Sequence, residues 1–149
     1  MSKYARFAAM IATSTIVMFG LMYLNTYALD HAFFSQTRAW MALVMGATMA
    51  VIMLLFMIGM YGDRSLNIAI LVGSALVFAV SLWLVRSQST VADVSWMKAM
   101  IPHHSIAILT SERARISDPR VRKLADNIIE AQRREIDEMK ALIQDLERR

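Results

Sequence analysis

The first 87 residues alternate long apolar stretches with short polar breaks, and the pattern then changes. Three stretches carry no charged residue, and they run over 7–29, 39–62 and 65–85. A helix of about 20 apolar residues crosses the hydrocarbon core of a bilayer, so each stretch is long enough to span it. The pattern predicts an all-α protein in which residues 1–87 form a three-span membrane domain in contact with the lipid bilayer.

The first apolar stretch has one feature of a secretory signal, because Lys3 and Arg6 precede it. It is longer than the apolar core of a typical signal peptide, and Tyr27-Ala-Leu-Asp30 is a poor cleavage site. We therefore expect a retained membrane helix. Lys3, Arg6 and Arg64 favour a cytoplasmic N-terminus. The residues after the third span would then face the periplasm from the inner membrane of a bacterium.

Residues 88–149 are more polar, and their apolar positions recur with the period of an α-helix. Asp93 is a candidate for the start of one helix, and Ser117-Asp118-Pro119 is typical of a helix stop followed by a capped restart. Pro102 lies within the first helical pattern, and it predicts a bend or a fresh start just before the residues that follow it. The segment is expected to form a soluble helical hairpin.

A hairpin of this length is too small to bury a full hydrophobic core by itself. We expect two copies of the chain to pair their hairpins into a four-helix bundle, which makes the protein a homodimer or a higher oligomer.

The first helix of the hairpin carries two adjacent histidines, His103 and His104, after Met97 and Met100. At about 100° per residue, His104 shares one apolar face with the two methionines. A buried imidazole needs a partner for each nitrogen, and either a metal ion or a carboxylate across the seam can serve. Thioethers are also ordinary core side chains, so packing around a histidine–carboxylate pair is an open alternative.

The second helix of the hairpin has an apolar stripe that is interrupted by Gln132 and Glu135. The stripe is expected to form the seam of the hairpin, and it consists of Val121, Leu124, Ile128, Met139, Leu142 and Leu146. A carboxylate in such a seam is costly unless it is paired. Facing helices would gather six candidate ligands: Met97, Met100, His103, His104, Glu135 and Met139. Imidazole and thioether ligands suit Cu(I) or Ag(I) best.

These motifs resemble a bacterial family catalogued as domain of unknown function 305. The resemblance covers about Val91 to the C-terminus and rests on Asp93-Val-Ser-Trp96, Met100-Ile-Pro-His103-His104, Gln132, Glu135-Ile136 and Met139. It implies a ferritin-like helical fold and an association with copper binding or resistance. The chain departs from the family pattern at Thr110, where a methionine is expected, and at Leu142, where an aromatic residue is usual.

Composition narrows the remaining possibilities. The chain is 57% hydrophobic, with thirteen methionines, which exceeds what an ordinary soluble domain of this length contains. It has no cysteine, which excludes disulfides, thiolate metal sites and cysteine nucleophiles. A net charge of +4, spread along the chain, gives no indication of nucleic-acid binding.

The second apolar stretch has methionines at every fourth position from Met41 to Met57. Such a ladder of thioethers is one way to pass Cu(I) across a bilayer. Methionine is also a flexible apolar side chain that fills gaps between membrane helices. We interpret the ladder as packing.

The sequence therefore predicts a membrane-anchored protein, not an enzyme, that binds copper or silver for homeostasis, resistance or hand-over to a partner protein. Asp93 and Gln132 are expected to orient the imidazoles. The first alternative is a structural oligomerising membrane protein with a buried histidine–glutamate pair. A copper transporter and a ferritin-like oxidase are further alternatives, but the seam holds one carboxylate where such oxidases need several.

Overall fold

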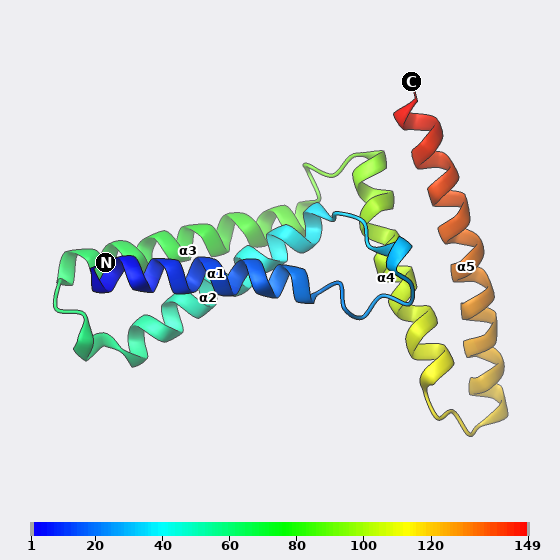
Figure 1. Cartoon of the computed structure of the whole chain (residues 1–149), viewed down its shortest axis with the longest axis horizontal. Coiled ribbons are helices and arrows are strands. Elements are labelled where there is room, and N and C mark those ends of the chain that lie inside the picture. The colour runs from blue at the N-terminus through cyan, green and yellow to red at the C-terminus, as the bar shows by residue number, and fades with distance from the viewer. Residues whose placement is uncertain (1, 149) are drawn as a thin grey trace. The chain divides into compact units, whose positions relative to one another are not determined.

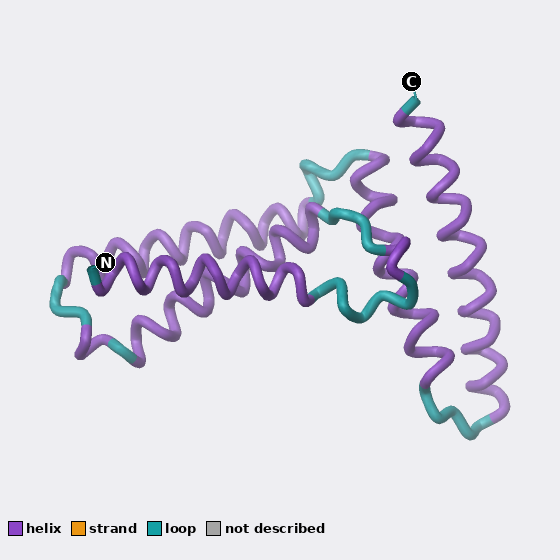
Figure 2. The backbone as a smooth tube through the Cα atoms, viewed as in Figure 1, coloured by secondary structure: helices purple, strands orange, loops and turns teal. Residues whose placement is uncertain are grey.

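The computed structural model describes residues 2–148, which are entirely helical apart from turns and loops (Figures 1 and 2). The elements are α1 (Lys3–Leu21), η1 (Leu29–His31), α2 (Gln36–Phe56), η2 (Ile58–Met60), α3 (Arg64–Ser87), α4 (Asp93–Arg113) and α5 (Pro119–Glu147). The predicted all-α class is confirmed for these residues.

The chain divides into two compact units that do not follow the sequence-based boundary near residue 87. The first unit is Met1–Met22 with Thr37–Thr90, and the second is Tyr23–Gln36 with Val91–Arg149. The loop between α1 and α2 thus belongs with the C-terminal hairpin, because it bonds to α4 and α5. A boundary drawn along the sequence misses this because the loop and its partners are far apart in the chain.

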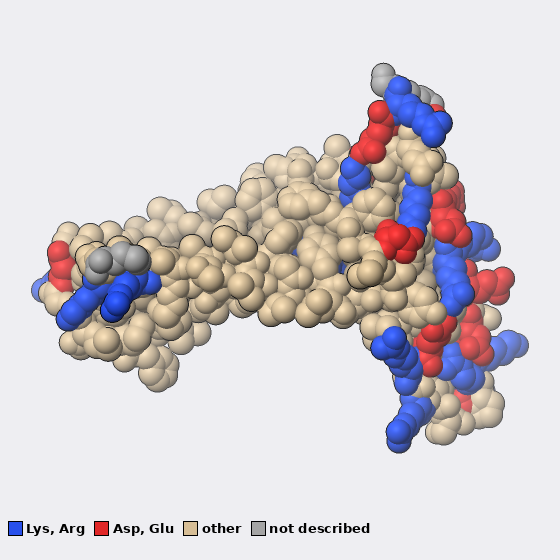
Figure 3. All heavy atoms as spheres, viewed as in Figure 1, with Lys and Arg blue, Asp and Glu red and all other residues tan. Residues whose placement is uncertain are grey.

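Three helices of the first unit, α1, α2 and α3, are long and apolar enough to cross a membrane. In Figure 3 the long apolar flank of these helices shows no charged side chains, which gather near their ends. The predicted first span, 7–29, differs from α1, which ends at Leu21. After that point the Arg38 guanidinium donates to the Met22 carbonyl at 2.6 Å, where a cation also complements the helix dipole.

The first unit has a polar cluster at the end where α1 begins and α3 begins. The Tyr4 hydroxyl donates to Asn67 Oδ1 at 2.9 Å, and Asn67 Nδ2 donates to the Tyr61 carbonyl at 2.9 Å. Asp63 caps α3 by accepting from the Leu66 amide at 3.0 Å. Phe7 and Tyr61 pack edge to face next to this cluster, so one end of the unit is fixed by both polar and aromatic contacts.

Farther along, α1 and α2 approach each other at Thr15 and Gly46. A Cβ atom built on Gly46 would lie 2.3 Å from the Thr15 hydroxyl oxygen, so any larger residue there would force Thr15 or its helix to shift. An apolar pocket of about 700 Å³ lies between the helices of this unit and includes Gly46 in its lining.

The hairpin of the second unit forms through α4 and α5. Its buried cluster combines residues of both helices, namely Met97, Ile101, Ile108, Ile136, Met139 and Ile143. The predicted restart is confirmed, because Asp118 accepts from the Arg120 amide at 2.8 Å and Pro119 opens α5. A fresh start before the histidines is wrong, since α4 continues through Pro102 from Asp93 to Arg113.

The seam of the hairpin differs from the predicted stripe. Val121, Leu124, Leu142 and Leu146 remain 50%, 58%, 46% and 37% exposed. The α5 residues buried against α4 are instead Ala125, Ile136, Met139 and Ile143. The true seam lies beside the predicted one around the helix, and Met139 belongs to both. This rotation leaves an apolar stripe on the outside of α5.

Candidate metal centre

The centre of the candidate site is a contact between His104 on α4 and Glu135 on α5. His104 Nε2 lies 2.8 Å from Glu135 Oε2, and His104 Nδ1 lies 3.0 Å from the Met100 carbonyl oxygen one turn earlier. The imidazole side chain is 15% exposed and the carboxylate side chain 44%. The pair therefore lies at the edge of the hairpin core, with the carboxylate open to one side.

The two hydrogen bonds of His104 fix the role of each ring nitrogen. A carbonyl oxygen can only accept, so Nδ1 carries a hydrogen and donates to Met100. Nε2 is left as the nitrogen that meets the carboxylate. Metal-binding histidines commonly have this arrangement, with one N–H held by a carbonyl and the other nitrogen aimed at the ion. Nε2 and Oε2, 2.8 Å apart, are therefore the two atoms that a cation could bind together.

The carboxylate has a second neighbour on its own helix. Gln132 Nε2 lies 3.5 Å from Glu135 Oε2, at the limit of a hydrogen bond. Gln132 thus orients the carboxylate rather than an imidazole, which differs from the predicted role. Asp93, the other residue predicted to orient an imidazole, is the exposed first residue of α4.

The predicted thioether ligands lie in the apolar core on either side of this pair. Met97 and Met139 are 5% and 7% exposed and share one buried cluster, and Met100 packs against that cluster. Met139 follows Glu135 by one turn of α5, and Met100 precedes His104 by one turn of α4. Sulfur-bearing side chains from both helices therefore accompany the imidazole.

His103 does not point with His104. It is exposed, and the two ring centroids are 6.5 Å apart with planes 64° apart. Neighbouring helical residues diverge by about 100°, which explains the separation. Within residues 2–148, no three histidine, aspartate or glutamate side chains come together as a group able to hold an ion. The structure thus brings together His104 and Glu135, places Met97 and Met139 in the hairpin core, and leaves His103 outside.

A set of contacts that sequence analysis did not predict lies on the opposite flank of the hairpin. His31, from the loop between α1 and α2, places Nδ1 2.9 Å from Oγ of Ser105, the residue after His104. The Tyr27 amide donates to the same oxygen at 2.7 Å. Ser105 is fully buried. One signal in the sequence could have indicated these contacts. The loop follows the first apolar helix and the hairpin follows the third, so both would lie on the same side of a membrane that the three helices crossed.

Charged residues strengthen this attachment. Lys140 bonds to Asp30, and Arg133 and the Tyr27 hydroxyl both contact Glu112. Burial is the largest cause that lowers the pKa of His31, and the positive charge of Lys140 adds to it. The hydrogen bond from Lys140 lowers the pKa of Asp30. The loop is therefore held by a neutral imidazole and a charged carboxylate.

Comparison with known proteins finds relatives for part of the chain. Residues 84–149 match the family described as Domain of unknown function (DUF305). An uncharacterised protein of Acanthamoeba polyphaga mimivirus, L153, is 36% identical over 69 residues, which cover 45% of this chain and 45% of that protein. The chain thus matches less than half the length of this curated relative. No solved structure matches the chain.

Proposed function

We propose that the protein is a membrane-anchored binder of copper or silver that buffers the ion, protects against it or hands it to a partner protein. The observation that carries the proposal is the pair of hydrogen bonds at His104. Nδ1 is occupied by the Met100 carbonyl, and Nε2 is directed at the Glu135 carboxylate. An ion would bind to Nε2 and to the carboxylate together.

The neighbouring thioethers support the choice of ion. Met97 and Met139 lie in the buried core of the hairpin and Met100 packs against it, so soft sulfur atoms are present in the same hairpin as the pair. Thioether with imidazole favours Cu(I) and Ag(I) over Mg²⁺ or Ca²⁺. We propose His104, Glu135 and these methionines as ligands, with His103 as a further ligand.

The proposed anchor is the set of three apolar helices, α1, α2 and α3. If all three cross the bilayer, the loop 23–36 and the hairpin emerge on the same side, which agrees with their hydrogen bonds to each other. We propose the inner membrane of a bacterium, with the hairpin in the periplasm, on the basis of the positive charges near the N-terminus.

The hairpin is proposed to be one half of a four-helix bundle of ferritin-like type, completed by a second copy. Two helices leave one side of their core open, and here that side carries the exposed apolar stripe of α5. We propose as the partner protein a donor or an acceptor of the same soft metal.

One competing function has an observation in its favour. The 2.8 Å contact between His104 and Glu135 is complete without an ion, as expected of a polar pair that fixes the register of an oligomerising membrane protein. A ferritin-like oxidase has less support, because such sites use several carboxylates. The methionines of α2 are proposed to serve packing rather than transport.

The test is ion affinity of the purified full chain in detergent. Cu(I), Cu(II), Ag(I) and Zn(II) are titrated in competition with a chromogenic chelator, for the wild type, His104→Gln and the double variant Met97→Leu/Met139→Leu. We expect Cu(I) and Ag(I) to bind tightest. His104→Gln should lower that affinity by at least about 100-fold, the upper end of the cost of losing even an outer partner of a ligand.

His31→Asn is the matched control, since it removes an imidazole on the other flank of the same hairpin and should leave affinity unchanged. The leucine variants keep the volume of the core and lose only the sulfur atoms. Equal binding by wild type and His104→Gln would reject the metal-binding proposal in favour of the structural one. Loss of Zn(II) but not Cu(I) binding in His104→Gln would reject the proposed ion.

A further inference from the structure

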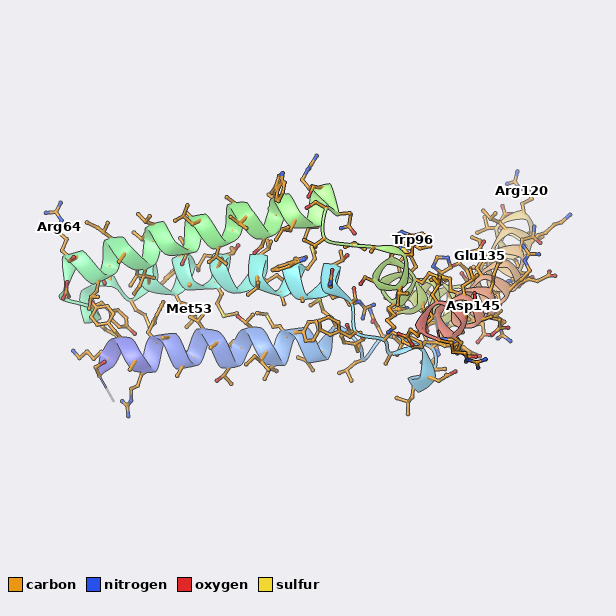
Figure 4. The ribbon with its side chains drawn as sticks, turned by 90° about the horizontal axis from the view of Figure 1, so that it is seen from above. Met53, Arg64, Trp96, Arg120, Glu135 and Asp145 are labelled. Atoms are coloured by element: carbon orange, nitrogen blue, oxygen red, sulfur yellow. The ribbon has the colours of Figure 1, made fainter. Side chains whose placement is uncertain are left out.

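The two flanks of the hairpin are unlike. The loop 23–36 covers one flank of the hairpin. It forms hydrogen bonds to Ser105 and Glu112 on α4 and to Arg133 and Lys140 on α5. The other flank is open, and it holds the carboxylate of Glu135. Its exposed side chains on α4 are Trp96 and His103, and those on α5 are Val121, Leu124, Leu142 and Leu146. We call this flank the open face; Trp96 and Glu135 are labelled in Figure 4.

The apolar residues of the open face are arranged symmetrically about Glu135. Ile128 and Leu142 each lie seven residues from Glu135, and Leu124 and Leu146 each lie eleven residues from it. Steps of seven and eleven return close to the same side of a helix with 3.6 residues per turn. A second α5 running antiparallel therefore matches Leu124 with Leu146 and Ile128 with Leu142 when the two helices cross at Glu135.

Charges beside this stripe are complementary in the same register. Arg134 and Glu138 are exposed and lie on the same edge of the stripe. In an antiparallel pair that crosses at Glu135, Glu138 of one copy lies within two residues, along the helix, of the level of Arg134 of the other copy. Each arginine thus meets a glutamate across the pair, twice by symmetry. In a parallel pair about a twofold axis along the helices, this edge of the two copies would lie on opposite sides of the interface, so Arg134 would not meet Glu138.

We propose that the open face binds the open face of a second copy about a twofold axis at the level of His104 and Glu135, and that the metal ion is shared between the copies. This inference rests on the proposed function and adds to it the identity of the missing ligands. Without an ion, such pairing would bring two Glu135 carboxylates close together. Two cations, each bound beside the axis by residues of both copies, compensate that charge.

The shared site also gives a role to His103. Within one chain its ring is exposed and its centroid is 6.5 Å from that of His104. Because His104 and Glu135 define the level of the axis, His103 lies one residue from that level on the face that the second copy covers. The second copy's His103 is therefore the candidate for the ligand that one hairpin lacks. The site has His104, Glu135 and thioethers from one copy and His103 from the other.

Cysteine cross-linking tests the pairing directly, because the natural chain has no cysteine. The double variant Ile128→Cys/Leu142→Cys should form covalent dimers upon mild oxidation of the full chain in detergent. The two positions are 14 residues apart on one helix, about 21 Å, so a disulfide within one chain is impossible. The matched control is Asp126→Cys/Gln144→Cys, whose positions are equally symmetric about Glu135 but lie on the other side of α5. It should not cross-link.

Charge exchange supplies a second test without cysteine. Arg134→Glu and Glu138→Arg should each shift the full chain towards monomer at a given concentration, measured by light scattering with detergent correction. The combined exchange Arg134→Glu/Glu138→Arg should restore the dimer. Failure of the exchange to restore it, together with equal cross-linking of both cysteine pairs, would overturn the antiparallel register.

Ion stoichiometry separates this inference from the proposed function. By the twofold symmetry the site occurs twice, so we expect two Ag(I) bound per dimer, with affinity falling at least about tenfold in His103→Ala and falling equally when Leu142→Glu prevents pairing. Gln144→Glu adds the same charge outside the open face and should change neither. Tight binding by monomeric Leu142→Glu would overturn the shared site and leave the proposed function intact. Dimers that bind none of the four ions would reject both the shared site and the proposed function.

Discussion

His31 Nδ1 accepts a hydrogen bond from the Ser105 hydroxyl at 2.9 Å, although the two residues are 74 positions apart. We assign the hydroxyl as the donor because His31 Nε2 faces Asp30 Oδ1 at 4.0 Å and therefore carries the hydrogen of the neutral ring, while the Tyr27 amide already donates to the same hydroxyl oxygen at 2.7 Å. The hydroxyl hydrogen is thus free to point to the imidazole. The loop between two long apolar helices is thereby fastened to the residue that follows His104.

Replacing Ser105 with alanine should loosen this attachment. The change removes an acceptor from the Tyr27 amide and a donor from His31 at a fully buried position, and unsatisfied buried groups cost about 1–3 kcal/mol. We expect faster hydrogen exchange at the Tyr27 amide and a lower free energy of unfolding. Thr110→Ala is the control, because its hydroxyl is exposed and bonds only to carbonyls of its own helix. Equal effects of the two changes would contradict the assigned bond.

Acid should release the loop. Burial and then Lys140 lower the pKa of His31 from its ordinary value of 6.5, while Asp30 and Asp137 oppose this weakly. The detached loop binds a proton more readily than the attached loop. Attachment is therefore fully stable above pH 6.5, and this contribution is lost as the pH falls through the lowered pKa. The lowered pKa of Asp30 acts in the same direction at still lower pH.

Hydrogen exchange of the loop amides at several pH values would measure this release. His31→Gln is the informative variant, because the amide oxygen can accept from Ser105 and does not titrate in this range. Its loop should stay attached at a pH where that of the wild type detaches. A wild-type loop that exchanges at the same corrected rate from pH 7.5 to pH 5 would disprove the role of His31.

The Asp30–Lys140 ion pair should contribute little by comparison. Asp30 is 69% exposed, and exposed pairs are worth about 0.2–1 kcal/mol. A double-mutant cycle with Asp30→Asn and Lys140→Met should give a coupling energy in that range, which falls further in about 1 M salt. A coupling well above this range would show that the pair is more shielded from water than its exposure indicates.

Gly46→Ala should destabilise the packing of α1 on α2. The added Cβ would lie 2.3 Å from Thr15 Oγ1, which is itself bonded to the Ile11 carbonyl at 2.8 Å and cannot easily move. Overpacking of this kind costs about 1–3 kcal/mol. Thermal unfolding in detergent should show a lower midpoint, and Thr15→Ala in the same chain should recover most of it.

Gly73→Ala on α3 provides the comparison for that experiment. No atom lies within 4 Å of a Cβ atom built there, and alanine favours helix more than glycine does. Its midpoint should be unchanged or raised. If Gly46→Ala behaved like Gly73→Ala, α1 and α2 would not approach as closely as the structure indicates.

Much of the fold follows from local patterns. Charge-free runs predict the three apolar helices, and Asp118-Pro119 predicts the start of α5, because the length of a bilayer and the capping of a helix act on neighbouring residues. The seam of α5 was predicted on Leu124 and Leu142, whereas Ile136 and Ile143 are buried. Both sets are apolar with the same period, and only the position of α4 decides between them.

The candidate site was predicted in part for the same reason. His104 and Glu135 interrupt apolar patterns at matching places, so their contact follows from pairing two helices. The divergence of His103 from His104 is a consequence of helix geometry that adjacency in sequence conceals. Ser105 and His31 carry no pattern at all. Their contact depends on where a distant loop lies, which no local rule specifies.

The fastening of the loop has a consequence for the order in which the protein matures. His31 leaves the ribosome long before Ser105, and Asp30 precedes its partner Lys140 by 110 residues. Two further apolar helices are therefore synthesised before any partner of the loop exists. Its attachment is among the last events of assembly, and a nascent chain arrested before α4 would display an unfastened loop that proteases can cut.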